Sequence, residues 1–101
     1  MMNTEITKHK PIPSTFTKKG FIYRQIKRQG DIAIFEQTRK DSTLQNFEVV
    51  KIGRHNGYTM GGSYIEPSET YPGSSLWGIM GWTCTCLADA EKRFSTILEL
   101  P

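Results

Sequence analysis

Few side chains in this sequence have the chemistry of metal ligands. The soft candidates are two cysteines, Cys84 and Cys86, and two histidines, His9 and His55. A structural zinc site is closed by a full tetrahedral set of ligands, and roughly two to four residues usually separate its paired cysteines. Only one residue separates Cys84 from Cys86. We therefore predict no metal site and interpret both cysteines as reduced, partly buried thiols.

The residues needed for catalysis are not grouped in the sequence either. Nucleophilic catalysis requires a cysteine or serine beside a histidine base, and no spacing in the chain brings His55 to Cys84. The carboxylates Glu66 and Glu69 lie in a polar stretch, and the glycine pair 61–62 lacks the following Lys-Ser/Thr of a phosphate-binding loop. The sequence predicts a protein that is not an enzyme and needs no cofactor.

Positive charge is concentrated at the start of the chain. Residues 1–28 carry seven basic residues and one acidic residue, whereas the remainder carries six basic and nine acidic ones. Basic side chains on one surface can neutralise phosphates, and exposed tyrosines can stack on bases. The candidate nucleic-acid contacts are Lys18, Lys19, Arg24, Lys27 and Arg28. No known nucleic-acid-binding motif accompanies them, and a solvated basic tail is the simpler alternative.

A second candidate surface is a long aromatic loop. Residues 66–78 contain two prolines and two glycines and follow no structural period, and such long loops are often functional. Tyrosine and tryptophan are enriched at the centres of protein interfaces. The candidate partner contacts are Tyr64, Tyr71, Leu76 and Trp77. The alternative is a second small core under the loop, which we expect to contain Trp82.

Strand and turn signals dominate residues 21–65. Two β-rich runs, 21–28 and 31–38, flank a turn predicted at Gln29-Gly30, and a third strand is predicted over 45–55. Asn56-Gly57 matches a type I′ hairpin turn, which would place His55 opposite Tyr58. Glycines 61 and 62 would then lie within the next strand, where glycine allows a bend or the close approach of a large ring, with Trp82 as the candidate ring.

An amphipathic helix is predicted near the C-terminus. Its apolar stripe consists of Leu87, Ala90, Phe94, Ile97 and Leu98. The sequence therefore predicts the α+β class: an antiparallel meander of four to five strands with one C-terminal helix packed on one face. At 101 residues this is one domain, residues 20–101, preceded by a flexible basic arm, residues 1–19. No apolar run suits a signal peptide or membrane span, so we expect a cytoplasmic protein.

The chain also resembles a group of short bacteriophage-encoded proteins of unassigned function. The motifs that carry this resemblance are KKGFIYRQI, GDIAIFEQT, FEVVKI, RHNGY, EPSETYP, SLWG, GWT and AEKRF, over roughly residues 11–98. The resemblance implies a small accessory protein that acts in the host cytoplasm by binding a host or phage macromolecule, for instance as an inhibitor of a host defence or host enzyme. We therefore predict a monomer or homodimer that binds a protein partner, with nucleic-acid binding as the alternative.

Overall fold

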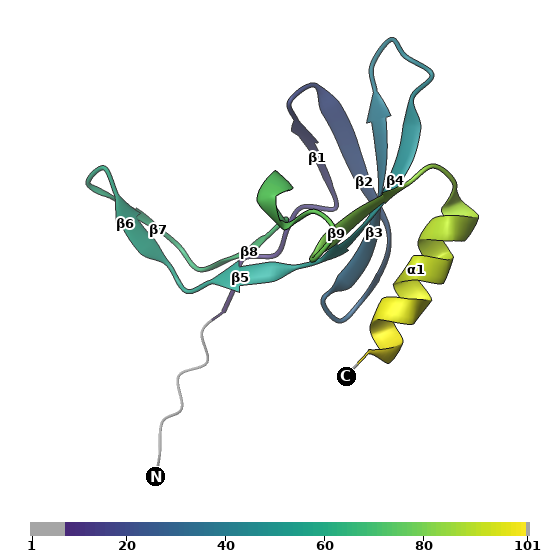
Figure 1. Cartoon of the computed structure of the whole chain (residues 1–101). Helices are drawn as coiled ribbons and strands as arrows, with labels where there is room; N and C mark the ends of the chain where they lie inside the picture. Colours follow the sequence, from purple (N-terminus) through teal and green to yellow (C-terminus); the bar gives the residue numbers. More distant parts are fainter. Residues whose placement is uncertain (1–7, 101) are drawn as a thin grey trace.

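The computed structural model describes residues 8–100 and is built around a five-stranded antiparallel sheet (Figure 1). Its strand order is β1-β2-β3-β4-β9. The strands are β1 (Thr15–Lys18), β2 (Phe21–Gln29), β3 (Ile32–Arg39), β4 (Gln45–Lys51) and β9 (Gly81–Cys84). The helix α1 (Leu87–Glu99) packs against β3, β4 and β9. The predicted α+β meander with one C-terminal helix is confirmed.

The N-terminal segment takes part in this sheet. Strand β1, which the sequence assigned to a flexible arm, pairs with β2 from Thr15 opposite Arg24 to Lys18 opposite Phe21. The two-residue turn Lys19-Gly20 joins them, and both residues have positive φ, as a type I′ turn requires. Residues 1–7 of the predicted arm lie outside the described residues.

The β2–β3 hairpin differs from its prediction by one residue. Gln29 pairs with Ile32, so the turn is Gly30-Asp31 rather than Gln29-Gly30. A bulge between Gln25 and Lys27 then shifts the register again. Moving the turn by one residue changes the pairing by two residues and keeps the faces, but the one-residue shift at the bulge exchanges the faces of β2 beyond it. An uninterrupted β2 would place Ile22 and Ile26 on the face of Ala33 and Phe35, and the bulge prevents this. Tyr23 lies with Ala33 and Phe35, and Ile26 with Ile32 and Ile34.

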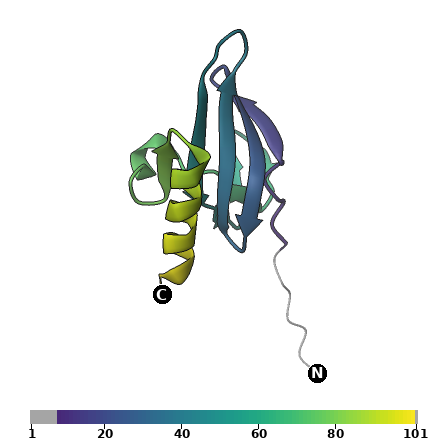
Figure 2. The ribbon, with the colours of Figure 1, turned by 90° about the vertical axis from the view of Figure 1, so that its right-hand side faces the viewer.

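One face of the sheet is covered by the helix (Figure 2). The predicted apolar stripe supplies Ala90, Phe94 and Ile97, all buried, and Leu98 packs beside them. The sheet residues buried under the helix are Ile34, Phe47 and Val49. Apolar burial of this kind is the main source of the stability of a small domain.

The opposite face carries a second core. Its buried residues are Tyr23, Ala33, Phe35, Val50 and Ile52, and its partly buried residues are Ile12, Phe16, Phe21, Tyr71 and Trp77. Ile12 comes from the segment before β1, Phe16 and Phe21 from β1 and β2, and Tyr71 and Trp77 from the loop that precedes β9. The central strand β3 is consequently enclosed on both sides, with Ala33, Ile34 and Phe35 fully buried.

Beyond Ile52 the chain leaves the sheet and forms a projecting arm, residues 53–70 (Figure 1). The arm is a long hairpin in two parts: β5 (Gly53–His55) pairs with β8 (Ser68–Thr70), and β6 (Tyr58–Met60) with β7 (Ser63–Ile65). The short 3-10 turn η1 (Ser74–Leu76) follows. The arm makes the molecule elongated, with extents of 53 × 35 × 22 Å.

The tip of the arm turns at Gly61-Gly62, where both residues have positive φ. The predicted type I′ turn at Asn56-Gly57 is therefore wrong. Among residues 8–100, the only non-glycine residues with positive φ are Lys19 and Asp41, so Asn56 does not adopt the required conformation. His55 does contact Tyr58, with their rings 5.0 Å apart and edge to face.

The predicted contact of the Trp82 ring with Gly61 and Gly62 is wrong. Two other aromatic rings do lie against glycines. A Cβ atom at Gly61 or Gly62 would meet nothing within 4 Å. A Cβ at Gly57 would collide with the Tyr64 side chain, and one at Gly81 would collide with the indole ring of Trp77. An aromatic ring over a glycine shields the backbone of a strand and fixes the position of the ring.

Candidate binding sites: a projecting arm and an aromatic pocket

The base of the arm is attached to the sheet by an ion-pair network. Both carboxylate oxygens of Glu69 in β8 accept hydrogen bonds from Arg28 in β2, at 2.9 and 2.8 Å. Arg54 in β5 lies 3.4 Å from Glu69 and also pairs with Asp31. The Arg28 hydrogen bond is the largest of the effects that lower the pKa of Glu69 below its ordinary value. The side chain of Glu69 is only 9% exposed, so this contact is screened less than a surface pair.

The segment before β1 widens the base of the arm. The amide of Lys10 donates to the carbonyl of Pro67 at 3.0 Å, and the amide of Glu69 donates to the carbonyl of Lys10 at 2.9 Å. The ring of His9 hydrogen-bonds Asn56 at 2.8 Å. These contacts connect the start of the described chain to both sides of the arm, and the arm is therefore held in position at its base.

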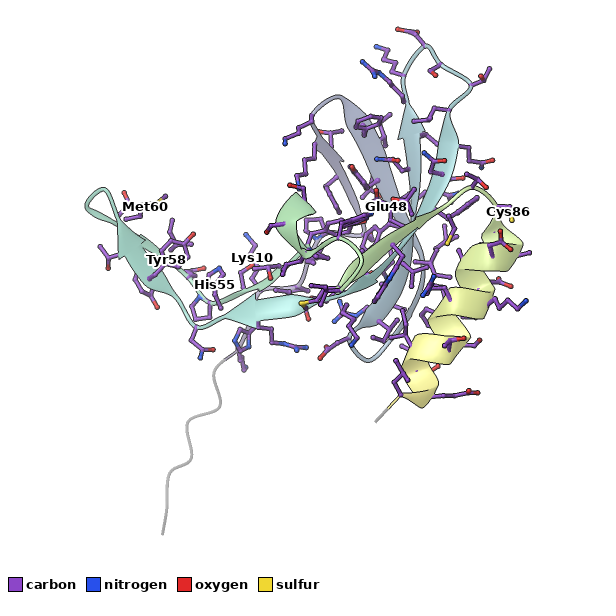
Figure 3. All side chains as sticks on the ribbon, in the orientation of Figure 1. Lys10, Glu48, His55, Tyr58, Met60 and Cys86 are labelled. Carbon is purple, nitrogen blue, oxygen red and sulfur yellow. The ribbon has the colours of Figure 1, made fainter. Side chains whose placement is uncertain are left out.

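The tip of the arm exposes large apolar side chains (Figure 3). Tyr58 is 46% exposed, Met60 64% and Tyr64 63%. Tyr64 pairs across the ribbon with Thr59, so it faces the side opposite to Tyr58 and Met60. None of these three residues packs in either core cluster. Tyr58, Met60 and Tyr64 together form the surface that we call the arm tip.

Tyr71 is the centre of the aromatic core beside the arm. Its ring lies 5.4 Å from Phe16, 5.7 Å from Tyr23, 5.3 Å from Phe35 and 6.5 Å from Trp77. Its hydroxyl donates a 2.6 Å hydrogen bond to Oε1 of Glu48 in β4. Burial and, to a smaller extent, the negative charge of Glu48 raise the pKa of Tyr71 well above its usual range. The phenol therefore stays protonated and remains a hydrogen-bond donor.

Glu48 is the charged residue of this core and lies on the sheet, on the side away from the helix (Figure 3). It is only 7% exposed. Burial raises the pKa of its carboxyl, and the Tyr71 hydrogen bond and the charge of Lys18 offset part of this effect. A buried carboxylate with a single protein donor close to it is costly unless something else interacts with it.

A cavity of about 270 Å³ opens above Glu48. Its lining residues are Lys18, Lys19, Phe21, Tyr23, Glu48, Tyr71, Pro72, Ser74 and Trp77. The ammonium of Lys18, an exposed residue, lies 5.9 Å from the centre of the Tyr71 ring. We call this cavity the aromatic pocket. It combines a buried carboxylate, aromatic walls and two lysines.

The raised pKa of Glu48 predicts how the free energy of unfolding changes with pH. Because the folded pKa lies above the ordinary value of 4.5, folding binds a proton between these two pKa values. The contribution of Glu48 to the free energy of unfolding is thus largest below pH 4.5 and decreases as the pH rises through its folded pKa. We expect Glu48→Gln to gain stability relative to the wild type as the pH rises from 4.5 to 8. Urea unfolding at a series of pH values measures this difference, and parallel curves for the two proteins would contradict the prediction.

The four predicted partner contacts do not form one surface. Tyr71 and Trp77 point into the sheet, and the indole nitrogen of Trp77 donates to Thr83 at 2.9 Å. Tyr64 and Leu76 are exposed, one on the arm tip and the other in η1. Trp82 packs in the helix-side core, with the guanidinium of Arg93 5.3 Å from the centre of its ring.

The five predicted nucleic-acid contacts are also divided. Arg24 pairs with Glu36 at 3.0 Å, and Lys27 lies 4.8 Å from the centre of the Phe94 ring on the helix side. Arg28 is on the opposite face and is engaged by Glu69. Lys18 and Lys19 are both exposed, and both line the aromatic pocket. One nucleic-acid strand lying on one face would therefore not reach all five.

The residues considered for metal binding lie apart. Within residues 8–100, no group of three or more His, Cys, Asp and Glu side chains could hold a metal ion. His55 accepts a hydrogen bond from the amide of Gly57 at 3.1 Å, and the thiols of Cys84 and Cys86 are free. No helix between residues 8 and 100 is long and apolar enough to cross a membrane.

Glu48 and the aromatic pocket were not predicted from the sequence. The available signal was a single acidic residue between the apolar residues Phe47 and Val49 of β4. Comparison with protein-family models, with curated proteins and with solved structures finds no match. The resemblance to short bacteriophage proteins stays a prediction.

Proposed function

We propose that this protein acts by binding another protein, and that the arm tip is the element that makes the contact. The observation that carries the proposal is the exposure of Tyr58, Met60 and Tyr64 on an arm that is held to the sheet at its base. Tyrosine and methionine are enriched at interfaces. In the phage context that the sequence resemblance implies, the partner is a host or phage protein.

The two-stranded ribbon of β6 and β7 gives the arm tip a second means of recognition. The ribbon has only these two strands, so the outer backbone groups of each strand are not used in the pairing between them. A partner can add a strand to such an edge and form main-chain hydrogen bonds while the side chains of the tip enter its surface.

Substitutions at the tip test this proposal without disturbing the core. Met60→Ser with Tyr64→Ser should leave the unfolding temperature of the sheet nearly unchanged, because neither side chain belongs to a core cluster. The wild-type protein, immobilised, is used to capture a partner from bacterial extract, and the purified partner is then titrated with each variant. We expect the tip variant to bind at least about tenfold more weakly.

Leu100→Ser provides the matched control, because Leu100 is 58% exposed at the far end of the helix. A third variant, Leu76→Ser with Ile79→Ser, separates the arm tip from the loop around η1. Sedimentation of the wild type and of each variant shows whether the partner is a second copy of the chain. In that case the wild type and the other variants sediment as a dimer and the tip variant as a monomer. Unchanged affinity of the tip variant for the captured partner would rule the proposal out.

A further inference from the structure

The groups that line the aromatic pocket differ in their exposure to solvent, and this difference gives them an order from the interior outward. Glu48 is buried at 7% exposure and is therefore the innermost group. The rings of Phe21, Tyr71 and Trp77 are half-buried walls. Lys18 and Lys19, where β1 ends and turns toward β2, are exposed and place positive charge at the opening.

This order restricts the class of ligand. An ionised carboxylate only accepts hydrogen bonds, so the innermost part of the ligand must donate them. The walls favour a flat ring that can stack, and the lysines favour an anionic group that remains outside. A free cation would suit Glu48 and the rings, but the two ammonium groups at the opening would repel it. A nucleoside phosphate has a donor edge, a flat ring and an anionic group in this order.

The nature of the acceptor selects among the bases. Guanine presents adjacent N–H groups, N1–H and the exocyclic N2 amine, that can both donate to one carboxylate, whereas adenine and cytosine have a single amino donor on the corresponding edge. Aromatic side chains stack on unpaired bases, and base edges supply the specificity. The cavity volume of about 270 Å³ is just below the usual range for drug-sized ligands, roughly 300–1,000 Å³, and suits a single base.

We propose that the aromatic pocket binds a guanine nucleotide unit, with the base edge on the Glu48 carboxylate, the ring against Tyr71 and Trp77, and the phosphate at Lys18 and Lys19. The unit can come from a free nucleotide or from an unpaired position in a single strand. This site is separate from the arm tip, and it assigns a role to two of the basic residues and to the buried acid.

Tryptophan fluorescence tests the site directly, because Trp77 lines the pocket and Trp82 lies on the other side of the sheet. In a Trp82→Phe background, the emission comes from Trp77 alone. The probes are GMP, AMP, guanosine and the single-stranded ribonucleotides UUGUU and UUUUU. Saturable quenching by GMP, with affinity at least about tenfold above that for AMP, is expected.

Two variants assign the contacts. Glu48→Gln should weaken GMP binding by about tenfold or more, because the amide replaces one acceptor with a donor. Glu91→Gln removes an exposed carboxylate from the helix and should have no effect. Lys18→Gln with Lys19→Gln should reduce the affinity for GMP to that for guanosine. Circular dichroism of each variant confirms that it is folded.

The two sources of the ligand give different results. Tighter binding of UUGUU than of GMP, with little binding of UUUUU, indicates an unpaired guanine in a strand, and equal or tighter binding of GMP indicates the free nucleotide. The proposal is overturned if neither GMP nor UUGUU quenches Trp77 at millimolar concentration. Undiminished GMP binding by folded Glu48→Gln would overturn it equally.

Discussion

Replacing Tyr71 with alanine is expected to lower the free energy of unfolding by about 3 kcal/mol. The ring contacts four other aromatic rings, and its removal leaves a void that the neighbouring strands cannot fill. It also removes the hydroxyl that donates to the buried Glu48. For a domain of this size the loss corresponds to a decrease in Tm of at least about 12 °C. Urea unfolding followed by circular dichroism measures it.

The more conservative variant Tyr71→Phe separates packing from hydrogen bonding. It keeps the ring and leaves the Glu48 carboxylate without the phenol, which should cost about 2 kcal/mol. Leu76→Ala, an exposed substitution five residues later, should change stability by less than about 0.5 kcal/mol. Wild-type stability in Tyr71→Ala would mean that the aromatic cluster is not part of the folded core.

Replacing Glu69 with alanine is the second change with a large expected effect, a loss of about 3 kcal/mol. Its carboxylate accepts two hydrogen bonds from the partly buried Arg28, and the substitution would leave this guanidinium with only the Gly30 carbonyl and the more distant Asp31. Glu66→Ala removes an exposed carboxylate from the same arm and serves as the control. The two single variants and the double variant Arg28→Ala/Glu69→Ala form a cycle that isolates the pair energy. A pair energy near zero would contradict the prediction.

The same pair makes the base of the arm sensitive to acid. Because the Arg28 hydrogen bond lowers the folded pKa of Glu69 below 4.5, its stabilisation is fully present above pH 4.5 and is lost as the pH falls through the folded pKa. Hydrogen exchange at the amide of Glu69, which donates to the carbonyl of Lys10, reports on this region. We expect this amide to lose protection in acid before the amides of β3 do.

The meander and the helix could be predicted because their signals are local. The apolar stripe of the helix needs only its own period, and β2 to β4 are consecutive strands joined by a hairpin and a short loop, whereas β1 lies in a segment that carries no strand pattern of its own. The turn of the arm was assigned incorrectly because two glycine-containing pairs compete within a few residues. A type I′ turn needs two positive φ angles, which Gly61-Gly62 supplies more easily than Asn56-Gly57. Asn56 instead contacts His9, a partner distant in sequence.

The aromatic pocket could not be predicted because its parts come from distant segments. Glu48 alternates along β4 onto the same face as Val50, but the residue that covers it, Tyr71, lies 23 positions later. Residue types do not settle the role of Tyr71 and Trp77 either, because tyrosine and tryptophan suit an interface and a core equally well. Only the contacts of Trp77 with Gly81 and Thr83 show that it belongs to the fold.

The enclosure of β3 on both faces has a consequence for synthesis of the chain on the ribosome. Strands β1 to β4 emerge first and can pair with one another, yet the segments that cover their two faces, around Tyr71 and Trp77 on one side and α1 on the other, are made last. The outer edge of β4 also remains unpaired until β9 is complete. A nascent chain that stops before Leu87 therefore exposes the apolar helix-side face of its sheet, and such a chain is prone to aggregation or to capture by chaperones.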